Sequence, residues 1–125
     1  MSDPTIFAQV QLRFEGLHCW PEAGDFIPEV AFLSNLHRHI FHVTVKVEQY
    51  HDDRDIEYIA FKRKLEAHVR EEIAPGGNLG RQSCEQIGTK IGRHVQSLVG
   101  SRSISVTVLE DGENGAVLYF PKEAL

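Results

Sequence analysis

Residues 36–49, LHRHIFHVTVKVEQ, are the stretch of sequence that decides the fold. Every second residue from His37 to Val47 follows one pattern: the first two are histidines and the rest are apolar. The residues between them are mostly polar. Successive side chains of a strand point to opposite faces of a sheet, so this period of two predicts a β-strand with one buried face. That buried face therefore begins with two imidazole side chains.

Three other segments show the same alternation. Residues 5–14 and 103–110 place apolar side chains at every second position, and residues 116–120 form a short apolar run after a turn at 111–115. Such runs, bounded by turn residues, are typical of strands, and the last two are predicted to form a hairpin. The segment between the first two strands carries two glycines and two prolines, which predicts a loop.

Two helices are predicted between the strand pairs. Residues 55–74 have apolar side chains at intervals of three and four, with Asp55 as the expected N-cap and Pro75-Gly76-Gly77 as the end. A second helix over 84–98 follows an S-x-x-Q capping box that starts at Ser83. The order ββααββ predicts one α+β domain over 1–125, an antiparallel four-stranded sheet with both helices on one face.

Composition excludes several classes of protein. The chain has 125 residues and a net charge of -5, which does not suit nonspecific binding to nucleic acid. Two cysteines are too few for a disulfide framework, and no apolar stretch is long enough for a membrane span. The beginning of the sequence shows no secretory pattern, so a cytoplasmic protein with reduced thiols is expected.

Three histidines are expected to meet at one end of the sheet. His37 and His39 project to the same side of their strand, with Cα atoms about 6.5–7 Å apart. Antiparallel pairing of the first two strands brings His18, just past the end of the first, beside them. Three neutral imidazoles with an open fourth position are typical of a catalytic zinc site. The alternative is a chance His-x-His pair, because the chain has seven histidines.

Two carboxylates are further candidates. Glu110 continues the apolar face of the 103–110 strand, and such a break in pattern is often functional. The alternative is that the strand has ended and Glu110 belongs to the turn. Glu85 lies in the first turn of the second helix, where interaction with the helix dipole is a sufficient reason for an acidic residue.

Four motifs in this order resemble the 6-pyruvoyl-tetrahydropterin synthase and 6-carboxytetrahydropterin synthase family, and they extend over nearly the whole chain. They match its Phe-x-x-x-His, its His-Gly-His before an alternating strand, its Thr-x-Glu at the start of the second helix and its Val-x-Val-x-Glu strand. The matching residues are Phe14-Glu15-Gly16-Leu17-His18, His37-Arg38-His39, Ser83-Cys84-Glu85 and Val106-Thr107-Val108-Leu109-Glu110.

The resemblance implies a zinc-dependent carbon–oxygen lyase of tetrahydrobiopterin or queuosine biosynthesis that acts on dihydroneopterin triphosphate or a related pterin. It also implies the tunnelling fold, in which trimers close a twelve-stranded barrel, two trimers often stack, and the pterin lies between subunits. The site residues it implies are His18, His37 and His39 as Zn²⁺ ligands, and Glu110, assisted by Glu85 or Ser83, as the group that binds the amino-pyrimidine edge of the pterin.

The chain departs from the family at its acid–base groups. The family's cysteine position, four residues before the first histidine of the pair, is Leu33, and residues 73–79 lack the family's Asp-His pair. Cys19 or Cys84 is a candidate replacement, and an inert thiol is the alternative for each. The losses leave a second reading of the whole protein, a noncatalytic relative that binds a pterin-like ligand or serves as an oligomeric scaffold.

Overall fold

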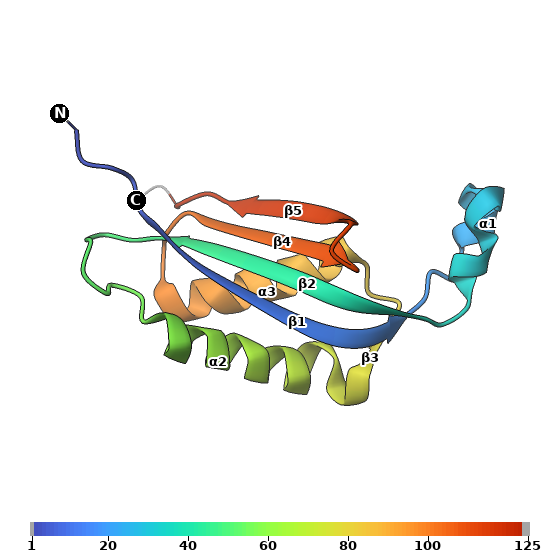
Figure 1. The fold of residues 1–125 in the computed structure, drawn as a ribbon. Coiled ribbons are helices and arrows are strands. Elements are labelled where there is room, and N and C mark those ends of the chain that lie inside the picture. Colours follow the sequence, from blue (N-terminus) through green and yellow to red (C-terminus); the bar gives the residue numbers. More distant parts are fainter. Residues whose placement is uncertain (1, 124–125) are drawn as a thin grey trace.

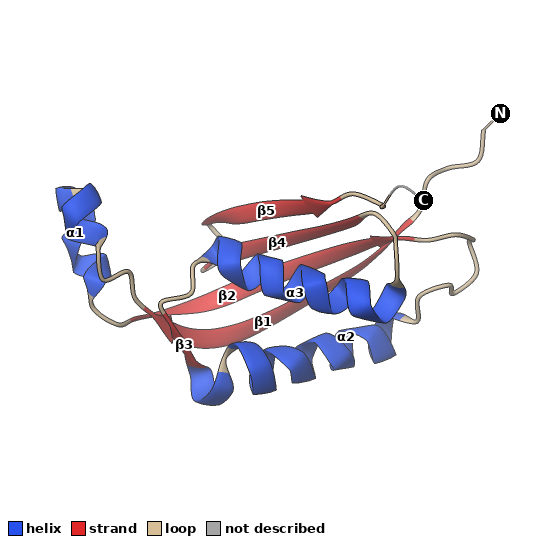
Figure 2. Ribbon diagram, turned by 180° about the vertical axis from the view of Figure 1, so that it is seen from behind, coloured by secondary structure: helices blue, strands red, loops and turns tan. Residues whose placement is uncertain are grey.

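Five strands form one mixed sheet in the computed structural model, which describes residues 2–123. The strand order is β3-β1-β2-β4-β5, and the four longer strands pair antiparallel as the sequence predicted. The helices α2 and α3 cover the same face of the sheet (Figure 2), also as predicted. The strands are β1 (Phe7–His18), β2 (His37–Glu48), β3 (Asn78–Gly80), β4 (Ile104–Glu110) and β5 (Asn114–Phe120).

The fifth strand corrects the four-stranded prediction. β3 has three residues and runs parallel to the end of β1, where Leu17 pairs with Asn78 and His18 with Gly80. The backbone N–H of Cys19 also donates to the Gly80 carbonyl oxygen at 2.8 Å. A three-residue strand shows no alternation in the sequence, so only its pairing reveals it.

The helices begin and end differently from the prediction. α2 (Tyr58–His68) starts after Glu57, whose side chain accepts from Ala60 N at 2.6 Å, so Asp55 is not the N-cap. The chain then continues as a π-helix, η2 (Val69–Ile73), and as a 3₁₀ turn, η3 (Pro75–Gly77). The predicted capping box before α3 (Cys84–Val99) is confirmed.

The core lies between the sheet and the two helices. Phe41, Val43, Val45 and Val47 of β2 are fully buried, and they belong to the face that the sequence identified. β5 comes close to α3 because two helix positions lack side chains. A Cβ at Gly92 would lie 2.2 Å from the Phe120 ring, which is closer than packed atoms can approach.

An arm of residues 20–36 stands apart from the sheet (Figure 1). The sequence predicted a loop here, but the arm contains α1 (Ala23–Phe26) and a 3₁₀ helix, η1 (Pro28–Ser34). Trp20 stacks on Phe26 with ring centroids 6.0 Å apart, and Phe26 and Phe32 are largely exposed. Short helices of this kind lack the repeated periodicity that marks longer ones.

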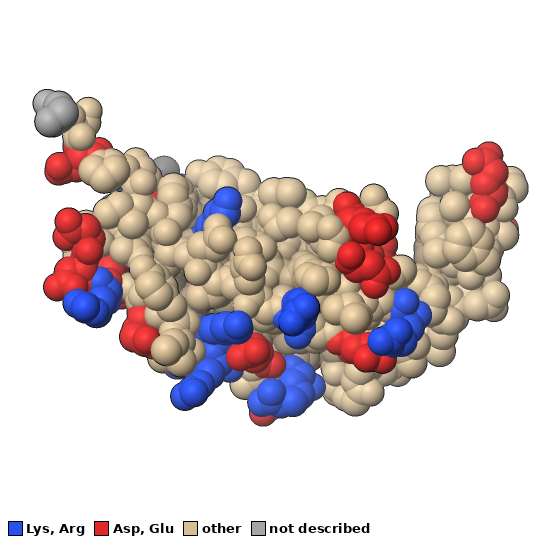
Figure 3. Space-filling view, in the orientation of Figure 1, with Lys and Arg blue, Asp and Glu red and all other residues tan. Residues whose placement is uncertain are grey.

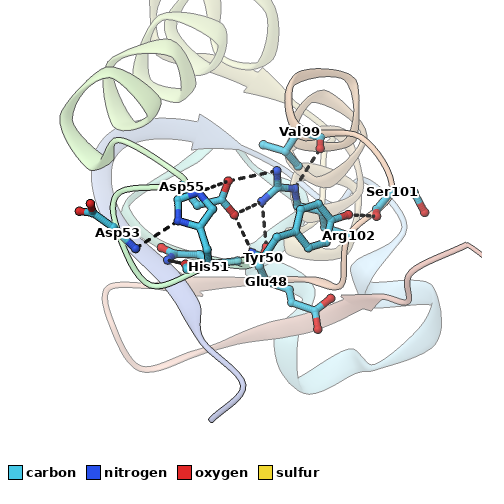
Figure 4. A network of polar contacts seen from close by, with 9 residues as sticks. Glu48, Tyr50, His51, Asp53, Asp55, Val99, Ser101 and Arg102 are labelled. Atoms are coloured by element: carbon cyan, nitrogen blue, oxygen red, sulfur yellow. Dashed lines mark hydrogen bonds and ion pairs between the residues drawn. The ribbon is translucent and has the colours of Figure 1, made fainter. Parts of the chain in front are cut away.

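An ion pair joins the loop after β2 to the segment before β4 (Figure 4). Arg102 Nη1 lies 2.7 Å from Asp55 Oδ2, and the guanidinium also stacks on the Tyr50 ring at 4.0 Å. Asp55 accepts from the backbone N–H of Tyr50 as well, at 2.6 Å. The network lies at the end of β2 opposite to His37.

Within residues 2–123, no helix combines the length and the apolar character needed to cross a membrane. Lysine and arginine side chains gather along α2, and acidic side chains gather at the tip of the β4–β5 hairpin (Figure 3). That acidic tip belongs to the same end of the sheet as the end of β1 and the start of β2 (Figure 1).

Candidate metal centre

Strand register brings the predicted histidines together. His18, the last residue of β1, pairs directly with His37, the first residue of β2, and His39 follows on the same face. β4 places Glu110 opposite Phe41, so that its carboxylate reaches the same point. One ligand atom from each of these four side chains, His18, His37, His39 and Glu110, lies within 4.8 Å of the others. This group can hold a metal ion.

Backbone carbonyls orient two of the imidazoles. His18 Nδ1 lies 2.9 Å from the carbonyl oxygen of Gln82, and His37 Nδ1 lies 2.9 Å from that of Asn35. A carbonyl oxygen only accepts hydrogen bonds, so each Nδ1 carries the proton and donates it. In the neutral rings Nε2 is then the atom with a free lone pair, which is how metal-binding histidines are commonly arranged.

A carboxylate orients the third imidazole. His39 Nδ1 lies 2.7 Å from Asp111 Oδ2. The pKa of Asp111 is lowered from its ordinary value by the hydrogen bond from the Ile40 backbone N–H, and further by His39 and Arg38. Asp111 is therefore an anion at neutral pH, and it accepts from His39 as the carbonyls accept from the other two rings.

The Nε2 atoms face Glu110 without a hydrogen bond. His18 Nε2 lies 2.9 Å and His39 Nε2 3.3 Å from Glu110 Oε2, yet neither buried nitrogen has a hydrogen-bond partner within residues 2–123. Two lone-pair atoms at this distance repel, and a cation between them removes the repulsion. Ligands of a tetrahedral ion at about 2.0–2.1 Å lie about 3.3 Å from one another, close to the observed spacing.

A cavity of about 410 Å³ opens beside this group, and it is lined by the other predicted site residues, Ser83 and Glu85, as well as by Glu110. Ser83 and Glu85 are positioned by the start of α3. The Ser83 hydroxyl accepts from Gln86 N at 3.2 Å as the N-cap, so its placement is fixed by helix capping. The arm contributes Trp20 and Leu33 to the same cavity.

The two cysteines and Leu33 differ in their capacity for acid–base chemistry. Burial raises the pKa of the Cys84 thiol to about 12, with Glu110 and Glu85 acting in the same direction. A thiol with that pKa stays protonated at neutral pH, so Cys84 is the inert alternative. Cys19 lines the cavity and is half-buried. Leu33 places an aliphatic side chain in the cavity wall, where the resemblance implies an acid–base cysteine.

Sequence reasoning missed four groups at this site: Asp111, Arg81 and the backbone carbonyls of Gln82 and Asn35. The sequence places Asp111 in a turn, and only the structure shows that its carboxylate reaches His39 and Ile40 of β2. The Gln82 carbonyl is a backbone group that no sequence pattern reveals. Arg81 lines the cavity and pairs with Glu22 of the arm at 2.6 Å, a contact that depends on how the arm folds.

The donor set is three imidazole nitrogens and one carboxylate oxygen. Such ligands suit Zn²⁺ and several other divalent transition ions, so the group could hold a metal ion of any of these kinds. In comparisons with known proteins, no family model and no curated protein sequence matches this chain.

Proposed function

We propose that the protein is a zinc enzyme that acts on dihydroneopterin triphosphate or a related pterin. The observation that carries the proposal is the convergence of three imidazoles, of His18, His37 and His39, beside an open cavity, with each Nδ1 atom already engaged by another acceptor. The resemblance of four ordered motifs to tetrahydropterin synthases supplies the substrate class. A bound Zn²⁺ would act there as a Lewis acid toward the hydroxyl groups of the substrate side chain.

The chain's own residues have separate roles in this proposal. The three histidines bind the ion. Their rings are oriented by the two backbone carbonyls and the carboxylate that accept hydrogen bonds from the Nδ1 atoms. Glu110 lies at the wall of the cavity. In this proposal the three histidines suffice for the ion and its fourth position is left open, so the Glu110 carboxylate is available to accept hydrogen bonds from the N–H edge of a pterin. Glu85 and Ser83, from the start of α3, face the same space and assist.

Triphosphate release tests the catalytic proposal. The zinc-loaded protein is incubated with dihydroneopterin triphosphate, and inorganic triphosphate and the pterin products are measured over time. Release that depends on His37, and is absent from a His37→Ala control, supports the lyase. Binding of the pterin without release favours the second candidate, a noncatalytic pterin-binding protein. Leu33 in the cavity wall and the protonated Cys84 thiol are the observations that favour this candidate.

Glu110→Gln is expected to weaken pterin binding roughly tenfold or more. A carboxylate accepts two charge-assisted hydrogen bonds from a guanidine-like edge, whereas an amide offers only one oxygen. Zinc content should stay the same, because three imidazoles remain. Titration calorimetry with neopterin or biopterin measures the change.

Glu113→Gln is the matched control, because it lies in the same turn and is exposed. Equal pterin affinity of wild type and Glu110→Gln would remove the anchoring role. Loss of zinc from Glu110→Gln would assign the carboxylate to the metal instead. A wild type that binds neither pterin would show that the ligand class is wrong.

A homo-oligomer built on trimers, up to a hexamer, is part of the proposal. Within residues 2–123, β5 has a neighbouring strand on one side only, and β3 covers only the end of β1. Val117 and Tyr119 of β5 are 72% and 64% exposed. Pairing of β5 with β1 of another copy removes both open edges. Light scattering should give a multiple of the 14.1 kDa chain mass; a stable monomer at micromolar concentrations would contradict this.

A cytoplasmic location also belongs to the proposal. Both cysteines, Cys19 and Cys84, are free thiols, and free thiols persist in a reducing compartment.

A further inference from the structure

Asp111 makes three hydrogen bonds to consecutive residues of β2. Its Oδ2 lies 2.7 Å from His39 Nδ1, and its Oδ1 accepts from the Ile40 backbone N–H at 2.9 Å. Its own backbone N–H donates to the Ile40 carbonyl oxygen at 2.7 Å. The two backbone bonds hold the residue in place, so the direction of its carboxylate toward His39 is determined by the fold.

The turn aims this carboxylate back at β2. Asp111 has a φ of 55° and Gly112 a φ of 73°, both in the left-handed region. Asp-Gly is a preferred pair for such turns because aspartate and asparagine tolerate this conformation better than most residues, and glycine adopts it freely. The Glu113 N–H donates to the Glu110 carbonyl oxygen at 2.9 Å and closes the turn.

We propose that Asp111 is a positioning residue that fixes the tautomer of His39. A carboxylate can only accept, so the ring must keep its proton on Nδ1 and present the Nε2 lone pair to His18 and Glu110. The inference rests on the proposed function only where it concerns zinc, because the tautomer is a property of the protein without the ion. Neither carboxylate of the Glu110-Asp111 pair is then redundant. One faces the cavity, and the other fixes the ring behind it.

Asp111→Asn separates this role from that of a turn residue. Asparagine also tolerates the left-handed conformation, so the turn is retained. Its single carbonyl oxygen can still accept from the Ile40 N–H, which leaves the NH₂ group facing His39 Nδ1. An NH₂ group donates, so Nδ1 must become the acceptor and the ring proton moves to Nε2, the atom that binds the metal.

Nitrogen-15 NMR of histidine-labelled, metal-free protein measures the tautomer directly. Wild type and the control Glu113→Gln should show His39 protonated at Nδ1. Asp111→Asn should show it protonated at Nε2, and Asp111→Gly, which keeps the turn without a side chain, should show a mixture of both. An Asp111→Asn spectrum identical to wild type, or an equal change in Glu113→Gln, would overturn the proposal.

Zinc affinity gives a second readout, by competition with a chromophoric chelator. Loss of a carboxylate partner of a ligating histidine typically weakens metal binding about 10–100-fold, and Asp111→Asn is expected to fall in this range while Glu113→Gln matches wild type. Unchanged affinity with a shifted tautomer would overturn the link between Asp111 and zinc. A wild type that binds no zinc would instead overturn the proposed function, and the NMR result would still decide the role of Asp111.

Discussion

His37→Ala and His39→Ala are each expected to lower the zinc content well below one ion per chain. Wild type should carry about one Zn²⁺ per chain, because one ligand nitrogen from each of the three imidazoles lies within 4.8 Å of the others. Removing either ring leaves two imidazoles and a carboxylate that also faces solvent. The carbonyl oxygens that accept from the Nδ1 atoms cannot replace the lost ligand, because they lie on the side of each ring that faces away from the ion.

Metal analysis of the purified, dialysed variants measures the effect, and His42→Ala is the matched control. His42 belongs to the same strand but projects to the opposite face. It should therefore keep the full zinc content, with the same circular dichroism spectrum as the other variants. Full retention of zinc in both His37→Ala and His39→Ala would refute the assignment of the site.

Arg102→Ala is expected to lower the melting temperature at pH 7 by about 5 °C or more. The side chains of Arg102 and Asp55 are only 12% and 11% exposed. The guanidinium also donates to the carbonyl oxygens of Val99 and Glu48 at 3.1 and 3.3 Å. Removing it leaves the partly buried Asp55 without its ion-pair partner and two carbonyl oxygens without this donor, which costs more than breaking a pair between fully exposed side chains.

The loss of thermal stability in Arg102→Ala should become smaller at acidic pH. Arg102 lowers the pKa of the Asp55 carboxyl below its ordinary value of 3.8, with the Tyr50 N–H acting in the same direction. The stabilisation is therefore complete above pH 3.8 and is lost as the pH falls through the lower pKa of the folded state. Thermal unfolding followed by circular dichroism should show the difference from wild type narrowing only in that acidic range.

Asp53→Asn is the control for this pair. It breaks the neighbouring ion pair between Asp53 and Arg54. The side chains of these residues are 74% and 85% exposed, respectively, and such a pair contributes little to stability. The melting temperature of Asp53→Asn should therefore stay close to that of wild type. An Arg102→Ala variant as stable as Asp53→Asn would show that the Arg102 network does not stabilise the fold.

Long elements were predictable from the sequence because packing against one core imposes a period on them. The 36–49 strand is confirmed as His37–Glu48, and the 84–98 helix as Cys84–Val99. β3 and the helices of the arm are too short to carry a period. The Asp55 prediction was wrong because Glu57 fits the N-cap position, and the contact of Asp55 with Arg102 joins segments 47 residues apart.

The meeting of the three histidines was predictable for a similar reason. Antiparallel pairing of two consecutive strands forces the end of β1 beside the start of β2, and this brings His18 to His37. The groups that orient the imidazoles were not predictable in the same way. Two of them are backbone carbonyls, of Gln82 and Asn35, and any residue type supplies a carbonyl. The third, Asp111, has a second role in a turn that was sufficient to explain it.

A metal ion bound at the histidine centre would make the stability of the fold depend on the supply of that metal. The centre joins distant parts of the chain, since His18 contacts a residue 64 positions away and His39 one 72 positions away. An ion held by this assembled group and released by the unfolded chain adds RT ln(1 + [M]/Kd) to the free energy of unfolding, about 4 kcal/mol at a free concentration a thousand times Kd. A chelator would then act on this protein as a mild denaturant, and metal starvation would enlarge its unfolded fraction.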